Sequence, residues 1–403
     1  MSKIKTTFIN LIYFITLSFL ILTFILSLVI FPKESFEGAL YGINLWINTI
    51  LPALLPFFIG SSIMMELGII KLLGHFLEPI MRPLFNVPGE GAFALAMGLT
   101  SGYPVGAKIA ASLREQNMCT KAEAERLMSF CNNSGPLFMI GAVGTGIYNN
   151  PILGYIILIS NYLSAITTGF FFKYYRRDYP KKKLEKTKSL SIILREFYTT
   201  YKKNRKPIGI LLGNAVKDSV NSLLMICGFI VLFSVILKIL ETIGIMYILS
   251  LPINSIIQIF NLHPSLAPSI AKGIFEITLA SKSISETVAP LYQKIIVTGM
   301  IIAWGGLSIH AQVLSIISKT DIKVTPYIIA KIFQGLISSI YSFVLIRIMY
   351  SKAITCSYLF TTIAKNSGWL VRLEYSAKTF FFIIILLILF SLSLHLIQKF
   401  KKI

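Results

Sequence analysis

Glycines and hydroxyl side chains interrupt an apolar stretch at residues 98–108, which read Gly-Leu-Thr-Ser-Gly-Tyr-Pro-Val-Gly-Ala-Lys. Glycine and proline break helices, and a helix broken inside lipid frees backbone groups that must find partners. Such a break is tolerated where it lines a cavity, and it brings partly charged helix ends there. We therefore predict the tip of a substrate-binding hairpin, with Thr100, Ser101, Tyr103 and Lys108 as contacts. The alternative is a packing kink in which glycines let helices approach closely.

A second polar group, Cys131-Asn-Asn-Ser-Gly-Pro136, lies near the start of another apolar stretch. Two amides and a hydroxyl are costly at membrane depth unless they are hydrogen bonded. Asn132, Asn133 and Ser134 are therefore predicted to form the polar half of the same site, facing Thr100 and Ser101. An ordinary helix cap is the alternative, because Asn and Ser are common at helix ends.

A third group lies in the apolar stretch 266–286, which contains Lys272 and Glu276. The two are four residues apart, so they could pair on a helix. A charge inside such a segment is a site hypothesis by default, and both are predicted to contact substrate. If this stretch lies at the membrane surface instead, the charges are simply solvated. His310 with Gln312 could also line the pathway, although a lone histidine in a bundle is more often a hydrogen-bonded packing residue.

Eight long apolar stretches reach the roughly 20 residues that a membrane-spanning helix needs. They cover 9–31, 40–66, 128–147, 152–172, 217–240, 292–318, 325–350 and 378–397. Two others, 90–112 and 266–286, carry Gly, Pro or charge in their middles and are predicted to be re-entrant helical hairpins. Only 14% of the chain is charged, against roughly 25% in soluble domains. The expected fold class is an all-α polytopic membrane protein.

Basic residues fix the expected topology. They gather in segments that lie on one side if the N-terminus is cytoplasmic, above all in the loop 173–206. In this topology both termini are cytoplasmic. The order span, hairpin, span, span then occurs twice, over 40–172 and 217–350, and the second copy starts on the opposite side. This order predicts an inverted repeat, a recurring plan of secondary transporters.

The net charge of +21 is explained by these loops, so no nucleic-acid partner is expected. The sequence contains no Gly-x-x-x-x-Gly-Lys-Ser/Thr, His-Glu-x-x-His or Gly-x-Ser-x-Gly motif. The four cysteines and four histidines are isolated. We therefore expect no enzyme, no catalytic residue, no cofactor and no metal site.

The motifs at 98–108 and 131–136 resemble those of the YlbJ (SpoVV) family of sporulation integral membrane proteins. That family carries the nucleoside-recognition or Gate domain, shared with concentrative nucleoside transporters and FeoB-type iron transporters. The likeness covers roughly residues 35–350 and is most specific in the first half. It implies a Gate-type fold with two hairpins. It also implies movement of dipicolinate, a small aromatic dianion, from the mother-cell cytosol across the outer forespore membrane.

The resemblance supplies no binding residues, so their roles rest on residue type alone. Lys108 and Lys272 suit two carboxylates, the group at 132–134 could donate hydrogen bonds, and Tyr103 could stack on a ring. The expected function is a sporulation transporter of a small organic anion, with dipicolinate as the first choice. A nucleoside carrier and a non-transporting sporulation scaffold acting through its basic loop are the alternatives.

The chain is divided into an N-terminal span (1–35), a first Gate-like repeat (36–175), a basic cytoplasmic linker (176–210), a second, inverted repeat (211–352), and a C-terminal loop, span and basic tail (353–403). The expected partners are the lipid bilayer and a small anionic substrate. Self-association and contact with other sporulation membrane proteins stay open.

Overall fold

The structure is a computed structural model, and it describes residues 2–67, 69–176 and 207–366. Every regular element within these ranges is a helix. The predicted span 378–397 and most of the basic linker lie outside the described residues.

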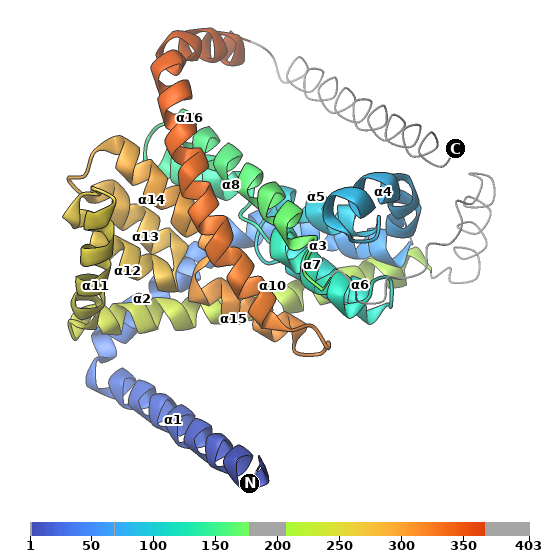
Figure 1. Ribbon diagram of the computed structural model, residues 1–403, viewed down its shortest axis with the longest axis horizontal. Coiled ribbons are helices and arrows are strands. Elements are labelled where there is room, and N and C mark those ends of the chain that lie inside the picture. The colour runs from blue at the N-terminus through green and yellow to red at the C-terminus, as the bar shows by residue number, and fades with distance from the viewer. Residues whose placement is uncertain (1, 68, 177–206, 367–403) are drawn as a thin grey trace.

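The first half of the chain forms helices up to residue 172 (Figure 1). They are α1 (Ser2–Ile30), α2 (Pro32–Leu45), the π-helical turn η1 (Trp46–Ile50), α3 (Leu51–Glu66), α4 (Ile69–Phe85), α5 (Gly91–Ser101), α6 (Val105–Glu115), α7 (Lys121–Cys131), the π-helix η2 (Leu137–Ile147) and α8 (Pro151–Phe172).

The second half follows the same order: a long helix, a shorter helix, a pair of short helices, a broken helix and a long helix. Its elements are α10 (Ile208–Thr242), α11 (Ile245–Ile259), the 3-10 turn η3 (Pro264–Leu266), α12 (Ala267–Phe275), α13 (Ile277–Glu286), α14 (Leu291–Trp304), α15 (Gly306–Ile317) and α16 (Val324–Asn366). Order alone does not give orientation, so the inverted repeat stays a prediction.

Four helical stretches among the described residues are long and apolar enough to cross a membrane. They are Pro151–Phe172, Ile208–Thr242, Leu291–Ile317 and Val324–Met349. A fifth results if Phe14–Ile30 and Pro32–Asn48, which meet at a bend of 102°, form one span. The all-α membrane class is therefore confirmed, whereas the number of eight spans stays a prediction.

The prediction of one continuous span over 128–147 is wrong. Helix α7 ends at Cys131, residues 132–136 are not helical, and η2 begins at Leu137. Asn132 is extended (φ −98°, ψ 97°), and Pro136 has no backbone N–H to continue the α7 ladder. The predicted span 292–318 is found as one candidate membrane-crossing stretch, Leu291–Ile317, although its helix is interrupted at Gly305, which has a φ of +90°. The predictions also lacked α4 and α11.

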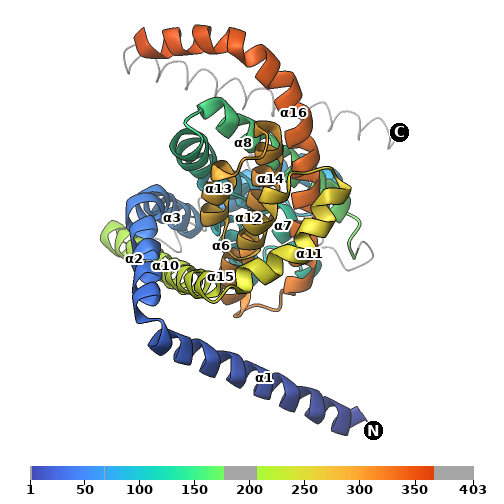
Figure 2. The ribbon, with the colours of Figure 1, turned by 90° about the vertical axis from the view of Figure 1, so that its left-hand side faces the viewer.

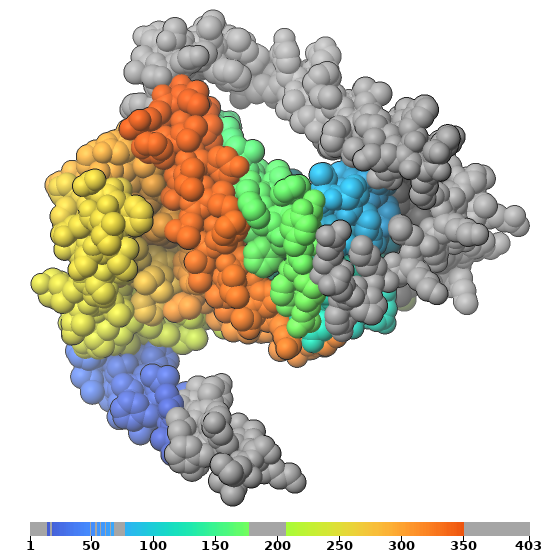
Figure 3. Space-filling view, in the orientation of Figure 1, coloured from blue at the N-terminus to red at the C-terminus, as the bar shows by residue number. Residues whose placement is uncertain are grey.

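Helix α16 has an apolar outer face and a polar inner face. The exposed residues include Ile329, Ile332, Leu336 and Ile340, whereas Lys331, Gln334, Ser338 and Ser342 are buried. In water the two faces would be reversed, so this pattern is typical of a helix that contacts lipid. Figure 3 shows α16 (orange) lying at the surface between α11 (yellow) and α8 (green).

Close packing of α2 against α10 depends on two glycines. A Cβ on Gly38 would lie 2.9 Å from the Cα of Val235, and one on Gly42 would lie 2.9 Å from the Cα of Val231. Figure 2 shows α2 (blue) beside α10 (yellow-green). The two helices therefore approach backbone to backbone, as small residues allow inside membranes.

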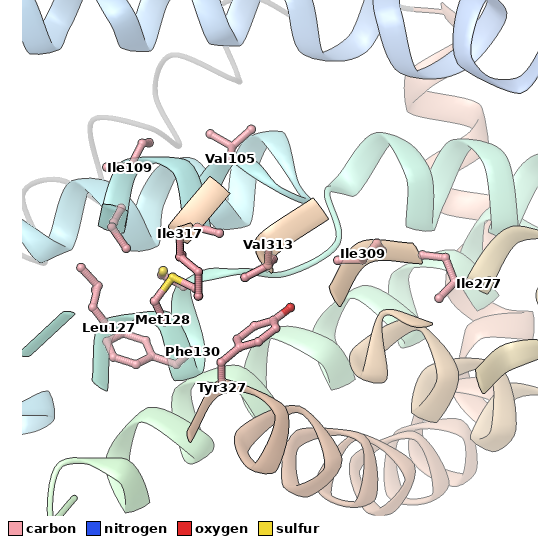
Figure 4. Packing of buried hydrophobic residues seen from close by; sticks show 14 of the residues in the cluster. Val105, Ile109, Leu127, Met128, Phe130, Ile277, Ile309, Val313, Ile317 and Tyr327 are labelled. Carbon is pink, nitrogen blue, oxygen red and sulfur yellow. The ribbon is translucent and has the colours of Figure 1, made fainter. Parts of the chain in front are cut away.

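The main core joins the two halves. Met128 and Phe130 of α7 belong to the same buried cluster as Val313 and Ile317 of α15, next to Tyr327 of α16 (Figure 4). The short helices of the first half are thus held by helices of the second, and the breaks between them are enclosed.

Candidate substrate-binding site

The first predicted hairpin is a pair of short helices with a break between them. Helix α5 ends at Ser101, Gly102 has a φ of +93°, and α6 starts at Val105. The two helices pack against each other. Positive φ is available to glycine at little cost, so the glycine at the tip fits the turn that the sequence predicted.

The carbonyl oxygen of Cys131, the last residue of α7, lies between both helices of this hairpin. A Cβ on Gly98 would be 1.7 Å from that oxygen, and one on Gly106 would be 2.0 Å from it. No side chain fits at either position. Gly98 and Gly106 therefore allow close helix packing, as the alternative interpretation predicted, and the helix is also broken between them.

The hairpin break and the break after α7 meet backbone to backbone. A Cβ on Gly102 would lie 2.6 Å from the amide nitrogen of Gly135. The second half repeats this contact, because a Cβ on Gly306 would lie 2.8 Å from the carbonyl oxygen of Phe275, where α12 ends. In each half, the break of the short helix pair thus touches the break of the helix that follows.

A cavity of about 110 Å³ lies where these breaks converge. Its polar and backbone lining consists of Ser101, Gly102, Tyr103, Ser134, Gly135, Glu276, Thr278, Ser308 and Gln312. Its apolar lining consists of Leu45, Ile50, Leu137, Phe138, Ile226, Ile230, Ile277 and Ile309. Figure 4 shows Ile277 and Ile309 close together. The cavity far exceeds the roughly 10–15 Å³ that one water molecule needs.

Four of the predicted site residues line this cavity: Ser101, Tyr103, Ser134 and Glu276. The hydroxyl of Ser101 is buried and has no hydrogen-bond partner within the described part of the chain. The structure therefore brings Ser101 and Tyr103 of the first hairpin, Ser134 of the break after α7, and Glu276 of the second helix pair to the same cavity.

Glu276 is a buried carboxylate that begins a helix. Its Oε2 accepts a hydrogen bond from the amide nitrogen of Leu279 at 2.7 Å, which caps α13. The predicted pairing with Lys272 is wrong, because α12 ends at Phe275 and Glu276 has an extended backbone. Lys272 instead forms an ion pair of 3.0 Å with Glu241.

Two predicted contacts of the first hairpin lie away from the cavity lining. The exposed Thr100 donates its hydroxyl to the carbonyl of Ala96 at 2.9 Å. Lys108 donates to the hydroxyl of Ser222 at 2.8 Å, and its Nζ lies 4.6 Å from the centre of the Phe58 ring.

Asn132 and Asn133 are completely buried and hold the break after α7. Asn132 donates to the hydroxyl of Tyr327 at 2.9 Å, and Asn133 donates to the carbonyl of Phe130 at 2.7 Å. The second bond satisfies a carbonyl in the last turn of α7, as a cap does. The predicted cap therefore exists, but it lies in the protein core.

Lys331 and Gln334 of α16 complete this polar network and were missed. Both are completely buried, and Lys331 Nζ donates to Gln334 Oε1 at 2.7 Å. The Nζ also lies 3.4 Å from Asn133 Oδ1 and 3.4 Å from the Tyr103 hydroxyl. A lysine inside the apolar stretch 325–350 was the available signal, since charges at membrane depth mark sites.

Tyr103 joins the first hairpin to the second half. Its hydroxyl donates toward the carbonyls of Ile302 and Ala303, at 3.0 and 3.3 Å, near the break between α14 and α15. These carbonyls lie where the helix ladder is interrupted by Gly305 and need other donors. One phenol thus connects two helix breaks.

His310 packs between aromatic rings, with centre-to-centre distances of 4.2 Å to Trp304 and 5.3 Å to Tyr327. The predicted packing role is supported. The predicted hydrogen bond is wrong, because neither ring nitrogen has a partner within the described residues.

Fold and site together define a helical membrane protein whose interrupted helices line a cavity of mixed polar and apolar character. The family model described as Gate, nucleoside recognition, matches residues 47–172. The sporulation integral membrane protein YlbJ of Bacillus subtilis (strain 168) is 40% identical over 324 residues, which cover 79% of this chain and 79% of that protein. The chain therefore belongs to the YlbJ family of sporulation integral membrane proteins.

Solved structures of CNTnw are also similar. One, in an inward-facing substrate-bound state, gives a TM-score of 0.43 at 11% identity and covers 74% of each chain. Another, a doubly substituted variant in an outward-facing state, gives 0.43 at 14% identity, with 81% of this chain and 82% of that chain covered.

Proposed function

We propose that this chain is a sporulation membrane transporter that carries a small organic anion, dipicolinate, from the mother-cell cytosol across the outer forespore membrane. One observation carries the proposal: breaks from both halves of the chain converge on one cavity that has both polar and apolar lining. Interrupted helices that line a central cavity are the usual binding sites of secondary transporters. Membership of a sporulation family supports the cellular setting.

The chemistry of the cavity suits a ligand with several acceptor oxygens. Helices α6 and α13 begin beside it, and helix N-termini carry partial positive charge. The hydroxyl of Ser101, which has no hydrogen-bond partner among the described residues, and the hydroxyl of Ser134 can donate hydrogen bonds, and the Tyr103 ring offers a stacking face. The apolar side of the cavity would cover the ring of an aromatic dicarboxylate.

A nucleoside carrier is the second candidate, and one observation favours it. Glu276 is the charged residue of the cavity lining, and a carboxylate accepts hydrogen bonds from sugar hydroxyls. The matching family model is described by nucleoside recognition.

Uptake into proteoliposomes that contain the purified protein tests the proposal. Labelled dipicolinate is compared with labelled nucleosides and with an unrelated dicarboxylate, under several ion gradients. We expect saturable flux of dipicolinate that nucleosides do not inhibit. Selective nucleoside flux would establish the second candidate, and no flux of any compound would favour a scaffold.

The predicted contacts of Lys108 and Lys272 with carboxylates are part of the same proposal. Lys108→Met and Lys272→Met are expected to lower dipicolinate uptake while the protein stays in the membrane. Normal uptake by both variants would remove these two residues from the site and leave the cavity-lining residues in place.

The proposed topology has both termini in the cytoplasm and two inverted halves. A reporter that is active only in the cytoplasm, fused at either terminus or within 177–206, is expected to be active in all three positions. An inactive fusion at 177–206 would contradict the inverted arrangement.

A further inference from the structure

The side chain of Lys331 is buried in the protein core, without any exposed surface. Within the described residues its hydrogen bonds go to Gln334, Asn133 and Tyr103, which are all uncharged groups. Taking a charge out of water is unfavourable unless an opposite charge or strong hydrogen bonds compensate it. The position of Lys331 is therefore one that an anion would stabilise.

The hydrogen bonds of Lys331 are unequal. The bond to Gln334 is 2.7 Å long, whereas those to Asn133 and Tyr103 are both 3.4 Å. Charge-assisted bonds between an ammonium and a carboxylate are about 2.7–2.9 Å long and roughly twice as strong as neutral ones. A carboxylate could thus replace the two long contacts with gain, while Gln334 keeps the ammonium in place.

Tyr103 touches both the cavity and Lys331. It lines the cavity, and its ring centre lies 5.1 Å from Lys331 Nζ. Its hydroxyl is held by the carbonyls of Ile302 and Ala303. Neutral hydrogen bonds of this kind are individually weaker than the charge-assisted bond that a carboxylate would form with the Lys331 amino group.

We infer that Lys331 is the residue that recognises the charge of the substrate, and that it binds one carboxylate after the Tyr103 side chain turns aside. Gln334, which accepts the short hydrogen bond of 2.7 Å, keeps the amino group of Lys331 in position. The inference rests on the proposed function and deepens it, because it makes a carboxylate the group that the carrier requires. The basic residues predicted from sequence already have partners: Glu241 for Lys272, and Ser222 with the Phe58 ring for Lys108.

Removal of the charge with retention of the side-chain length tests the inference. Lys331→Met is compared with Lys294→Met, a partly buried lysine that donates to the carbonyl of Ser285 at 2.9 Å and does not line the cavity. The probes are pyridine-2,6-dicarboxylate and its uncharged diamide. We expect Lys331→Met to reduce the preference for the dicarboxylate by roughly tenfold or more, and Lys294→Met to keep it. An unchanged preference in Lys331→Met would overturn the inference.

Ligand-induced thermal shifts separate this inference from the proposed function. Wild-type protein that binds the dicarboxylate but shows no flux would refute transport while leaving the site testable. Without ligand, the thermal midpoint of Lys331→Met reports on folding alone, because the substitution removes a buried charge and leaves Gln334 Oε1 without its donor. With ligand, its thermal shift should vanish for the dicarboxylate and persist for the diamide.

Tyr103→Phe provides a second test that does not depend on the folding of Lys331→Met. It removes the hydroxyl that shares the ammonium protons and retains the ring. We expect a severalfold gain in affinity for the dicarboxylate relative to the diamide. An equal change for both probes would overturn the inference.

Discussion

Glu276 places a negative charge in the cavity proposed for an anion, and it does so at the start of a helix. The amide nitrogen of Leu279 donates to its carboxylate at 2.7 Å, and the partial positive charge of the α13 N-terminus offsets part of the negative charge. The carboxylate of Glu276 therefore has a structural role, which is to cap the N-terminus of α13. Its effect on substrate depends on whether the ligand carries charge or hydroxyls.

Glu276→Gln separates the two candidate substrates. Glutamine keeps an oxygen that can cap α13 and removes the repulsion of an anion. For dipicolinate we expect a severalfold lower KM, whereas for a nucleoside we expect a higher KM, because a carboxylate is the stronger acceptor. The measurement is concentration-dependent uptake into proteoliposomes.

The control for this variant is Glu286→Gln, at the exposed opposite end of the same helix. It should leave both KM values unchanged. A rise in the KM for dipicolinate on Glu276→Gln would contradict the assignment of an anionic substrate to this cavity.

Residue types identified part of the site from sequence. Ser101, Tyr103, Ser134 and Glu276 were predicted and line one cavity. Lys331 was missed because a single lysine in a long helix resembles an ordinary interfacial residue, and its partners lie up to 228 residues away in sequence. No local pattern contains that information.

At the scale of elements, the first hairpin depends on two glycines that leave space for the carbonyl oxygen of another helix, α7. The oxygen of Cys131 occupies the space where side chains of residues 98 and 106 would be. Backbone cannot move aside as a flexible side chain can, so an added methyl group must separate α5 or α6 from α7. We therefore expect this contact to be intolerant of change.

Gly98→Ala tests this contact. Overpacking of a close contact costs about 1–3 kcal/mol or more, so we expect a lower thermal midpoint and a smaller yield of folded protein. The matched control is Gly228→Ala in α10, where a Cβ would meet nothing within 4 Å. That variant should be tolerated, and its helix propensity rises. Equal stability of the two variants would contradict the described packing of α5 on α7.

The breaks in the elements were predictable where glycine and proline interrupt an apolar run, as at Gly102 and Pro104. No break was predicted at 132–136, because the polar group was placed near the start of a continuous span over 128–147. The structure buries it with Tyr327 and Gln334 from α16. Hydropathy alone cannot distinguish a polar group at an interface from one that is satisfied by another helix.

At the scale of the whole molecule, polar contacts join the halves next to the ends of several helices. Arg114, at the end of α6, forms an ion pair with Asp321, which lies between α15 and α16. The carboxylate of Glu125 accepts from the amide nitrogen of Lys323 at 3.1 Å. Both bonds connect the first half to the turn that precedes α16.

The Arg114–Asp321 pair predicts a pH dependence. The hydrogen bond from Arg114 holds the pKa of Asp321 below its ordinary value, with a smaller effect of the charge of Lys121. A carboxyl with a lowered folded pKa stabilises the fold above its unfolded pKa of about 3.9 and loses this contribution as the pH falls through the folded value. The Asp321 side chain is 46% exposed, so the contribution should stay below about 1 kcal/mol.

Asp321→Asn is therefore expected to lower the thermal midpoint by a few degrees or less at pH 7, and to have a smaller effect at acidic pH, as Asp321 becomes protonated in the folded protein. Glu115→Gln, next to Arg114 on the exposed end of α6, is the control and should change neither value. A larger difference at low pH than at neutral pH would contradict the sign of this argument.

The distance in sequence between partners has a consequence for biosynthesis. Asn133 accepts hydrogen bonds from Lys331 and Gln334, which follow it by 198 and 201 residues. At about 5–20 residues per second, ribosomes need roughly 10–40 s to supply them. During that interval the nascent first half contains an unsatisfied amide at its centre. A chain truncated after α8 should accordingly be recognised by membrane quality control and degraded.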